Sequence, residues 1–330
     1  MQDAPSLQEI ESALEQVSGR VIETPVVALA SDKLTDYLPD GARVTAKLEL
    51  FQQAGSFKAR GALINVDALT PEQKQAGVTA VSAGNHALAT AWAARRGGVN
   101  AKVVMMDYAD PVRIEGCRAM GAEVVLVPDV HKAFAEVERI KTEEGRSFIH
   151  PFEGKLTALG TATCGLEFIK QVPDMEAVVI PVGGGGLIAG MSRAIKLVNP
   201  DCLVFGVEPF GADSMYRSFA SGKAESLDKV STIADSLGAP MALPYSYDLT
   251  RNHVDEIVRI EDEEMLRAGT LLFDALKLAL EPAGAAATAA AMGPLKERLA
   301  GKRVGVLVCG SNIGEAKVAD LIAKGRALLG

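Results

Sequence analysis

The stretch Ile180-Pro181-Val182-Gly183-Gly184-Gly185-Gly186-Leu187 decides the fold class of this chain. An apolar run ends in four glycines, and a segment of helical character begins near Leu187. Glycine lets backbone N–H groups approach an anion closely, and a helix N-terminus adds a partial positive charge. The stretch therefore predicts a buried strand, a turn that can hold a phosphate, and a helix. A turn without a ligand is the alternative, but it rarely needs four glycines.

The alternation of strand-like and helix-like segments continues on both sides of this stretch. Short β-branched apolar runs occupy 44–48, 78–82, 101–106, 122–127, 177–182, 203–207 and 304–309. Segments of helical character lie between most of these runs. Runs that are apolar on both faces and separated by helices indicate parallel strands buried between helical layers. We therefore predict an α/β fold with a ligand site at the carboxyl ends of the strands.

The segment from about 71 to 148 holds consecutive strand–helix units, and no low-complexity linker sets it apart. Such a segment can form a small lobe inserted into a larger one. The expected small domain is 71–146, and the expected large, cofactor-binding domain combines 1–70 with 147–330.

The composition is that of a globular protein with an acidic balance. The 330 residues are 48% hydrophobic and 23% charged, which excludes a wholly disordered chain. With 34 basic and 42 acidic residues the net charge is −8, which disfavours nucleic acid as a partner. The four cysteines form no C-x-x-C pair, which is typical of a reducing compartment. No secretory signal is visible and Ala283–Leu295 is too short to span a bilayer, so we expect a cytoplasmic protein without a membrane partner.

Two further loops follow predicted strands and are expected to face the same crevice as the glycines. In Ser82-Ala83-Gly84-Asn85-His86, Ser82 can cap the next helix, and free backbone N–H groups can hold a carboxylate. Cys309-Gly310-Ser311-Asn312 places a small polar side chain at the end of the last strand. Taken singly, each loop is also compatible with an ordinary turn.

A nicotinamide-dependent oxidoreductase is a rival interpretation of the glycine stretch. Residues 184–189 fit the G-x-G-x-x-A pattern of dinucleotide-binding proteins. Glu208 follows the next strand about 20 residues later, where a ribose-binding acid would stand. This segment alone does not separate an NAD-dependent enzyme from other phosphate-binding proteins.

Lys58 is the most informative single residue. It lies between Phe57 and Ala59 at the start of a predicted helix, whereas most lysines are solvated. Burial beside an aromatic ring lowers the pKa of a lysine and makes its amine a nucleophile. A nucleophilic lysine together with a phosphate-binding loop indicates a Schiff base with pyridoxal 5'-phosphate.

Several motifs together resemble those of a known family. They are Gly55-Ser56-Phe57-Lys58-x-Arg60-Gly61-Ala62, Ser82–His86, the four glycines, Glu281-Pro282-Ala283-Gly284-Ala285 and Cys309–Asn312. From about Thr24 to about Leu321 the chain resembles the serine/threonine dehydratase family of fold-type II pyridoxal phosphate-dependent enzymes, of the threonine ammonia-lyase type. An NAD-dependent oxidoreductase explains neither the lysine motif nor Asn85 and becomes a distant alternative. Because the chain stops at Gly330, the regulatory C-terminal domain of biosynthetic threonine dehydratases is not expected.

The resemblance implies a role for each motif. Lys58 would be the catalytic residue, holding the cofactor and later acting as the base. Phe57 would lie against the pyridine ring, Asn85 would hydrogen-bond the ring 3′-oxygen, and Cys309 would face the pyridine nitrogen. The phosphate would be bound by Gly183, Gly184, Gly185 and Gly186, with Leu187 at the start of the helix. The substrate carboxylate would be bound by Ser82, Ala83, Gly84, Asn85 and His86.

The implied reaction is β-elimination from a hydroxy amino acid such as threonine or serine, which gives a 2-oxo acid and ammonia. A thiol at the ring nitrogen favours this reaction, because a poorer electron sink should expel the β-leaving group promptly. An amino-acid racemase of the same family is the alternative, but family racemases have a serine where this chain has Ala83, which has no proton to donate. Departures from the family pattern at 158–161 and 234–236 leave threonine, serine, phenylserine and hydroxyaspartate open as substrates.

The resemblance also implies a homodimer and bears on metal binding. Some relatives bind a divalent cation through an acidic pair, and Ser214 stands here at the second of these positions. No metal site is therefore expected, and Glu208 is interpreted as a solvated strand end.

Overall fold

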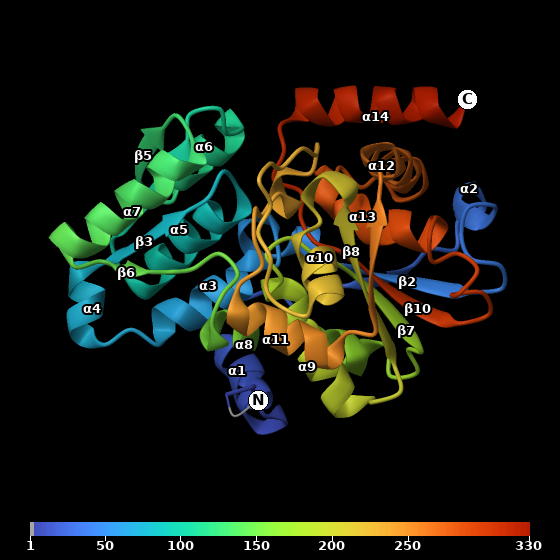
Figure 1. Ribbon diagram of the computed structural model, residues 1–330, viewed down its shortest axis with the longest axis horizontal. Coiled ribbons are helices and arrows are strands. Elements are labelled where there is room, and N and C mark those ends of the chain that lie inside the picture. The colour runs from blue at the N-terminus through green and yellow to red at the C-terminus, as the bar shows by residue number, and fades with distance from the viewer. Residues whose placement is uncertain (1–2) are drawn as a thin grey trace.

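The computed structural model describes residues 3–330 as two lobes that lie side by side (Figure 1). The strands are β1 (Val26–Ala28), β2 (Arg43–Leu48), β3 (Val78–Val81), β4 (Ala101–Met106), β5 (Glu123–Val127), β6 (Ser147–Phe148), β7 (Ala177–Pro181), β8 (Leu203–Pro209), β9 (Glu256–Ile260) and β10 (Arg303–Val308). The small lobe contains a sheet of order β5-β4-β3-β6, and the large lobe contains a sheet of order β1-β2-β10-β7-β8-β9. In residues 3–330 only the β1–β2 pair is antiparallel, so the predicted α/β fold with two mostly parallel sheets is confirmed.

Helices cover the faces of both sheets. They are α1 (Leu7–Val17), α2 (Asp32–Thr35), α3 (Lys58–Asp67), α4 (Pro71–Ala76), α5 (Asn85–Gly97), α6 (Pro111–Ala119), α7 (Val130–Glu144), α8 (Lys155–Gln171), α9 (Gly186–Val198), α10 (Ser214–Ser221), α11 (Pro244–His253), α12 (Asp262–Leu276), α13 (Pro282–Met292) and α14 (Glu315–Leu329). Short 3₁₀ turns are η1 (Glu49–Phe51), η2 (Gln53–Gly55), η3 (Phe210–Ala212) and η4 (Asp235–Leu237). In Figure 1, α12 and α13 lie on one side of the large sheet, and α8, α9 and α11 lie on the other.

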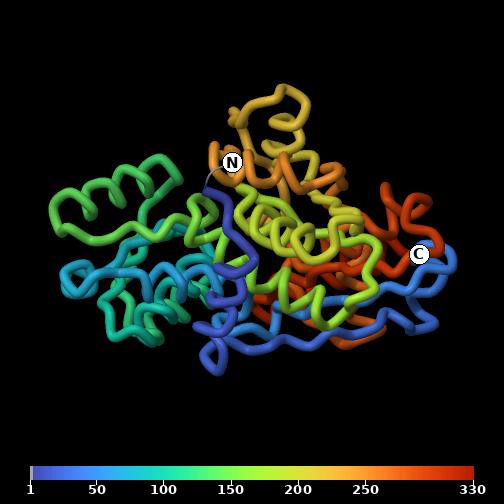
Figure 2. The backbone as a smooth tube through the Cα atoms, turned by 90° about the horizontal axis from the view of Figure 1, so that it is seen from below, coloured from blue at the N-terminus to red at the C-terminus, as the bar shows by residue number. Residues whose placement is uncertain are grey.

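The helices α1 and α3 join the two lobes. Val17 of α1 and Leu63 of α3 belong to the same buried apolar cluster as Val78 and Val103 of the small sheet. Ile10, at the other end of α1, belongs to the cluster around the large sheet. Figure 2 accordingly shows the N-terminal segment, in dark blue, at the junction of the lobes. The rigid placement of α3 matters because Lys58 is its first residue.

The carboxyl ends of three parallel strands bring the predicted loops together. β3 ends before the loop 82–86, β7 ends before the glycines, and β10 ends before Cys309. An isolated bridge between Ser56 and Gly310 places the lysine segment beside the end of β10. The site therefore forms where the two sheets face each other, as expected for parallel α/β sheets.

Candidate active site

A cleft of about 170 Å³ lies between the lobes and brings the predicted site residues together. Lys58, the loop 82–86 and Gly184 line it, as do Phe152 and the segment 235–240. Cys309 lies outside this lining: it is 2% exposed, and its thiol donates to the carbonyl of Ala283 at 3.3 Å. Burial raises the pKa of Cys309 well above its usual value, so the side chain at the end of β10 is a neutral thiol.

Lys58 projects into the cleft from the first turn of α3. The preceding N–H, that of Phe57, donates to the carbonyl of Cys309 at 3.2 Å, which fixes the start of the helix. The Lys58 ammonium donates to the carbonyl of Pro151 and lies 5.1 Å from the centroid of the Phe57 ring. Burial lowers the pKa of Lys58 to about 8, although the charge of Glu281 opposes the shift. The amine is therefore poised to become a neutral nucleophile near physiological pH.

Carbamylation by cyanate, in which a neutral amine is the nucleophile, provides a test of this pKa. Because the folded-state pKa is lowered to about 8, the neutral fraction of Lys58 should rise as the pH rises through about 8. Mass spectrometry of peptides from the cofactor-free protein should show Lys58 labelling with this midpoint. The exposed Lys324 is the control for the labelling chemistry itself. A midpoint for Lys58 near the usual value for a free lysine would contradict the assigned pKa.

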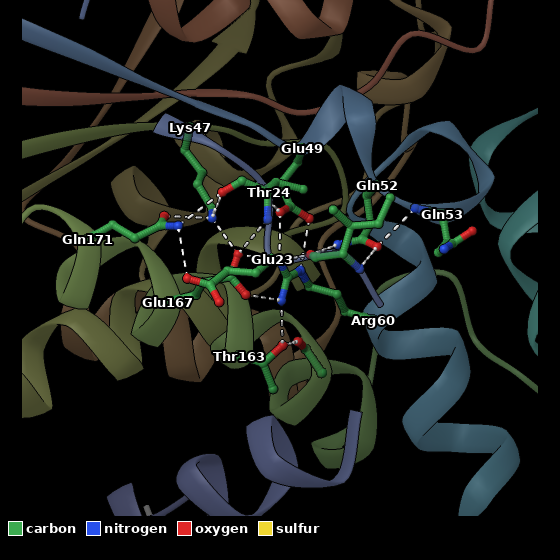
Figure 3. Close-up of polar contacts among 12 residues, drawn as sticks. Glu23, Thr24, Lys47, Glu49, Gln52, Gln53, Arg60, Thr163, Glu167 and Gln171 are labelled. Atoms are coloured by element: carbon green, nitrogen blue, oxygen red, sulfur yellow. Dashed lines mark hydrogen bonds and ion pairs between the residues drawn. The ribbon is translucent and has the colours of Figure 1, made fainter. Parts of the chain in front are cut away.

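A buried ionic network around Arg60, two residues after Lys58 in the sequence, holds α3 in place (Figure 3). The Arg60 guanidinium donates to both oxygens of Glu49, at 2.8 and 2.9 Å, and to both oxygens of Glu167, at 2.8 and 3.0 Å. Lys47 also pairs with Glu167 and donates to the carbonyl of Thr24 at 2.7 Å. Two cations thus balance two carboxylates, which is the arrangement that buried charges require. The network ties α3 to η1 and α8, the elements on either side of it.

The four glycines form a turn in which Gly184, Gly185 and Gly186 leave no room for a side chain. Gly185 has a φ of +91°, in the left-handed region. A Cβ on Gly184 would lie 2.3 Å from the ring of Phe152, and a Cβ on Gly186 would lie 2.4 Å from the carbonyl oxygen of Phe152. The helix α9 begins at Gly186, and Leu187 follows in its first turn. Because the first N–H groups of a helix have no acceptor within it, this turn fits a phosphate group.

The loop 82–86 differs from expectation at two side chains. Ser82 does not cap α5, because Gly84 occupies the N-cap position and the Ser82 hydroxyl accepts the N–H of Gly84 at 3.0 Å. The His86 ring turns toward the carbonyl of Ile149, with Nε2 at 2.8 Å from the oxygen. Burial lowers the pKa of His86 to about 3, so the ring is neutral and offers no charge to a carboxylate. The backbone N–H groups at the start of α5 have no acceptor within the helix, and no side chain caps them, so they can donate to an anion.

Asn85 belongs to a polar cluster that the sequence analysis did not assemble. Its amide nitrogen donates to Glu281 Oε1 at 2.5 Å and to Ser236 Oγ at 3.1 Å, while its oxygen accepts from Asn312 at 2.7 Å. Arg113 donates to the other oxygen of Glu281 at 2.9 Å. The motifs contained Glu281 and Asn312 but assigned them no role, and no sequence signal pointed to Arg113.

Glu208 is not a solvated strand end, which corrects the sequence interpretation. It is fully buried, and its two oxygens accept the N–H groups of Met215 at 2.9 Å and Tyr216 at 2.7 Å. Burial raises the pKa of Glu208 to about 8. Its role is to cap α10 from the end of β8. Within the described residues 3–330, no group of three or more side chains is arranged to hold a metal ion.

Comparison with known proteins decides whether the glycine turn belongs to a pyridoxal phosphate enzyme or to a nicotinamide-dependent enzyme. A family described as "Pyridoxal-phosphate dependent enzyme" matches residues 17–310. The chain belongs to this family. Membership confirms the fold-type II architecture and the predicted cofactor, pyridoxal 5'-phosphate, and removes the nicotinamide alternative. The lysine, the glycine turn and the neutral thiol at the end of β10 fit that cofactor.

Relatives in this pyridoxal-phosphate family share nearly the whole chain. Phenylserine dehydratase of Ralstonia pickettii is 52% identical over 97% of both chains. L-threonine ammonia-lyase of Thermotoga maritima is 36% identical over 97% of this chain and 79% of its own. The structure of maize serine racemase superposes with a TM-score of 0.89 at 32% identity, covering 97% of this chain and 99% of that one. The predicted class, a lyase that eliminates from hydroxy amino acids, is confirmed at this level.

Proposed function

We propose that the protein dehydrates 3-phenylserine to phenylpyruvate and ammonia. The observation that carries this proposal is the apolar wall of the cleft, which contains Met106, Val130 and Phe134 from the small lobe and Phe152 from the large lobe. Val130 and Phe134 stand four residues apart on α7 and therefore share one face of that helix. Phe134 is 37% exposed and presents an aromatic surface toward the cleft. A phenyl substituent covers such a wall, whereas the methyl group of threonine leaves most of it in water.

The name of the Ralstonia pickettii relative supports the same substrate. At 52% identity it is more similar to this chain than the threonine ammonia-lyase at 36%. The chemistry also favours an aromatic substituent. Loss of water from 3-phenylserine forms a double bond conjugated with the phenyl ring, which lowers the free energy of the product.

The side chains of the cleft account for the steps of an elimination. Bound pyridoxal phosphate supplies the electron sink that makes the substrate α-proton acidic. Lys58 Nζ, as the neutral amine that its lowered pKa allows, accepts this proton. The N–H groups at the start of α5 hold the carboxylate and orient the Cα–H bond toward Lys58. The bond from C3 to the hydroxyl breaks with its electron pair on oxygen, and the proton that Lys58 Nζ took from Cα is returned to this oxygen, so that water leaves. The released enamine tautomerises and hydrolyses to the 2-oxo acid and ammonia.

The remaining site residues are proposed as cofactor contacts. The turn Gly183–Gly186, with the N–H of Leu187, is suited to the phosphate, and Phe57 is suited to the ring. Asn85 is suited to the ring 3′-oxygen, because the N–H group that donates to the Ser236 hydroxyl can donate to that oxygen instead. Cys309 supplies a neutral thiol toward the ring nitrogen.

Racemisation is the weaker second candidate for this site. Serine racemases are among the relatives, so the fold supports that reaction. A racemase needs a proton donor on the face of the substrate opposite the lysine. Ala83, which lines the cleft in the loop 82–86, has no such proton.

Phe134→Ala tests the aromatic wall. The variant should lower kcat/KM for 3-phenylserine about tenfold, since it loses an aromatic pair and its buried area. It should leave kcat/KM for threonine within a factor of two, because a methyl group does not reach the ring. Leu126→Ala, another exposed apolar residue of the small lobe that does not line the cleft, is the control for general damage. Equal losses for both substrates in Phe134→Ala would contradict the assignment.

We also propose that the enzyme is a cytoplasmic homodimer of two-domain subunits, with the small domain at 71–146. All four cysteines are free, which supports a reducing compartment. Ile22 and Phe51 are 38% and 47% exposed and lie near each other, because Gln52 bonds both the N–H and the carbonyl of Ile22. Such apolar side chains suit a subunit interface, which sedimentation velocity can test. Between residues 3 and 330, no helix is long and apolar enough to cross a membrane.

A further inference from the structure

Arg113 reaches from the small lobe into the polar groups of the large lobe. It lies in the first turn of α6, yet its Nε donates to the carbonyl of Asn312 at 2.7 Å and its Nη2 donates to Glu281 at 2.9 Å. Its Nη1 lies 3.5 Å from Asp235. The side chain is only 4% exposed. One guanidinium therefore contacts three separate segments of the opposite lobe.

Glu281 depends on this contact for its counter-charge. The carboxylate is 1% exposed, and Arg113 is the only cation within ion-pairing distance of it in the part of the chain that the structure describes. Burial raises the pKa of Glu281, while the charge of Arg113 opposes that shift. A buried carboxylate without a counter-charge is strongly unfavourable, so the ion pair and the docked position of α6 stabilise each other.

Glu281 connects Arg113 to Asn85, because it accepts hydrogen bonds from both. Its second oxygen accepts the Asn85 amide, and Ser236 bridges both side chains, donating to Glu281 at 3.0 Å. Asn312 holds the oxygen of the same amide at 2.7 Å, and its own carbonyl accepts from Arg113. Two routes of two hydrogen bonds each thus connect Arg113 with Asn85. Both routes break when α6 leaves the large lobe, because both begin at Arg113.

We propose that Arg113 is a positioning residue that couples docking of the small lobe to the orientation of Asn85. With α6 docked, Glu281 keeps its counter-charge and the Asn85 amide is held from both ends. With α6 displaced, Glu281 loses its partner and the Asn85 amide is released. The proposal rests on the cofactor chemistry of the family and is independent of the identity of the substrate.

A neighbouring contact shows why the coupling is assigned to Arg113. Asp110 also joins α6 to the large lobe, accepting the N–H of Gly314 at 3.3 Å. That bond is longer, and it ends on a backbone group that makes no contact with Asn85. Asp110 therefore contributes to docking alone, whereas Arg113 contributes to docking and to the site.

The test compares Arg113→Met and Arg113→Lys with a matched control on the same helix. Arg118→Met removes an arginine that is 47% exposed and that, among the described residues, pairs only with Glu115 of α6 itself. Each holoenzyme is examined for hydrogen–deuterium exchange at 310–314, for release of pyridoxal phosphate on dilution, and for kcat and KM. Release is followed by the visible absorbance of the bound cofactor.

Arg113→Met should accelerate both exchange at 310–314 and cofactor release about tenfold, and should lower kcat more than it raises KM. Arg113→Lys keeps the positive charge but has one amine in place of the separate nitrogens of the guanidinium. It should therefore retain the cofactor better than Arg113→Met does. Arg118→Met should match the wild type in every readout. Unchanged exchange in Arg113→Met would overturn the docking role, and faster exchange with unchanged cofactor release would overturn the coupling. Cofactor release involves no substrate, so failure of the phenylserine assignment would leave this result intact.

Discussion

Lys58→Ala is expected to lower kcat by a factor of about 10³ or more, because it removes the only base proposed for the α-proton. The variant also loses the amine that attaches the cofactor, so its visible spectrum should change as well. The amine lies in the cleft, beside the Phe57 ring and the carbonyl of Pro151, and its pKa is lowered to about 8. The measurement is the rate of 2-oxo acid formation by purified protein saturated with pyridoxal phosphate.

Lys324→Ala is the matched control for this substitution. Lys324 lies on α14, 60% exposed, and pairs with Asp320 on the same helix. It should keep wild-type activity and an unchanged spectrum. Activity in Lys58→Ala above about one tenth of that of Lys324→Ala would show that another group removes the proton.

Arg60→Met should lower the free energy of unfolding by about 3–5 kcal/mol, the range for removing one partner from a buried ion network. Arg60 is fully buried and donates to both oxygens of Glu49 and of Glu167 (Figure 3). Among residues 3–330, its loss leaves Lys47 as the one cation paired with these two buried carboxylates, and Lys47 pairs with Glu167 alone. Urea unfolding of the holoenzyme, monitored by circular dichroism, measures the change.

Arg20→Met is the control for Arg60→Met, because it also removes an ion pair of α3 but from a partly exposed position. Arg20 pairs with Asp67 at the other end of α3, but its side chain is 35% exposed. Loss of a partly exposed pair should lower the free energy of unfolding by at most about 1 kcal/mol. Equal effects of Arg60→Met and Arg20→Met would contradict the claim that the buried network anchors the lysine helix.

The features with a local cause were predictable from the sequence. The α/β alternation, the glycine turn and the helix that begins at Lys58 all depend on residue types adjacent in the chain. Runs that are apolar on both faces predicted the inner strands to within about two residues. β9 was not predicted. Its sequence Glu256–Ile260 includes the polar Glu256 and Arg259, so it lacks the continuous apolar run that indicates a strand buried on both faces.

The features with a tertiary cause were not predictable. Glu208 looked like a solvated strand end, and only the placement of α10 shows that it accepts two N–H groups. Ser82 looked like a helix cap, but the turn of Gly84 moves the helix start beyond it. Arg113 belongs to none of the motifs, so nothing in the sequence distinguishes it from the other arginines. Its role exists only because α6 meets segments some 120 to 200 residues away along the chain.

A comparison of substrates on the purified holoenzyme tests the assignment of 3-phenylserine dehydration. 3-Phenylserine and L-threonine are each supplied over a range of concentrations, and the 2-oxo acid and ammonia are measured together with the enantiomers of the remaining substrate. We expect phenylpyruvate and ammonia in equal amounts, with a higher kcat/KM for 3-phenylserine than for threonine. A higher kcat/KM for threonine, or inversion of substrate without 2-oxo acid, would contradict the assignment.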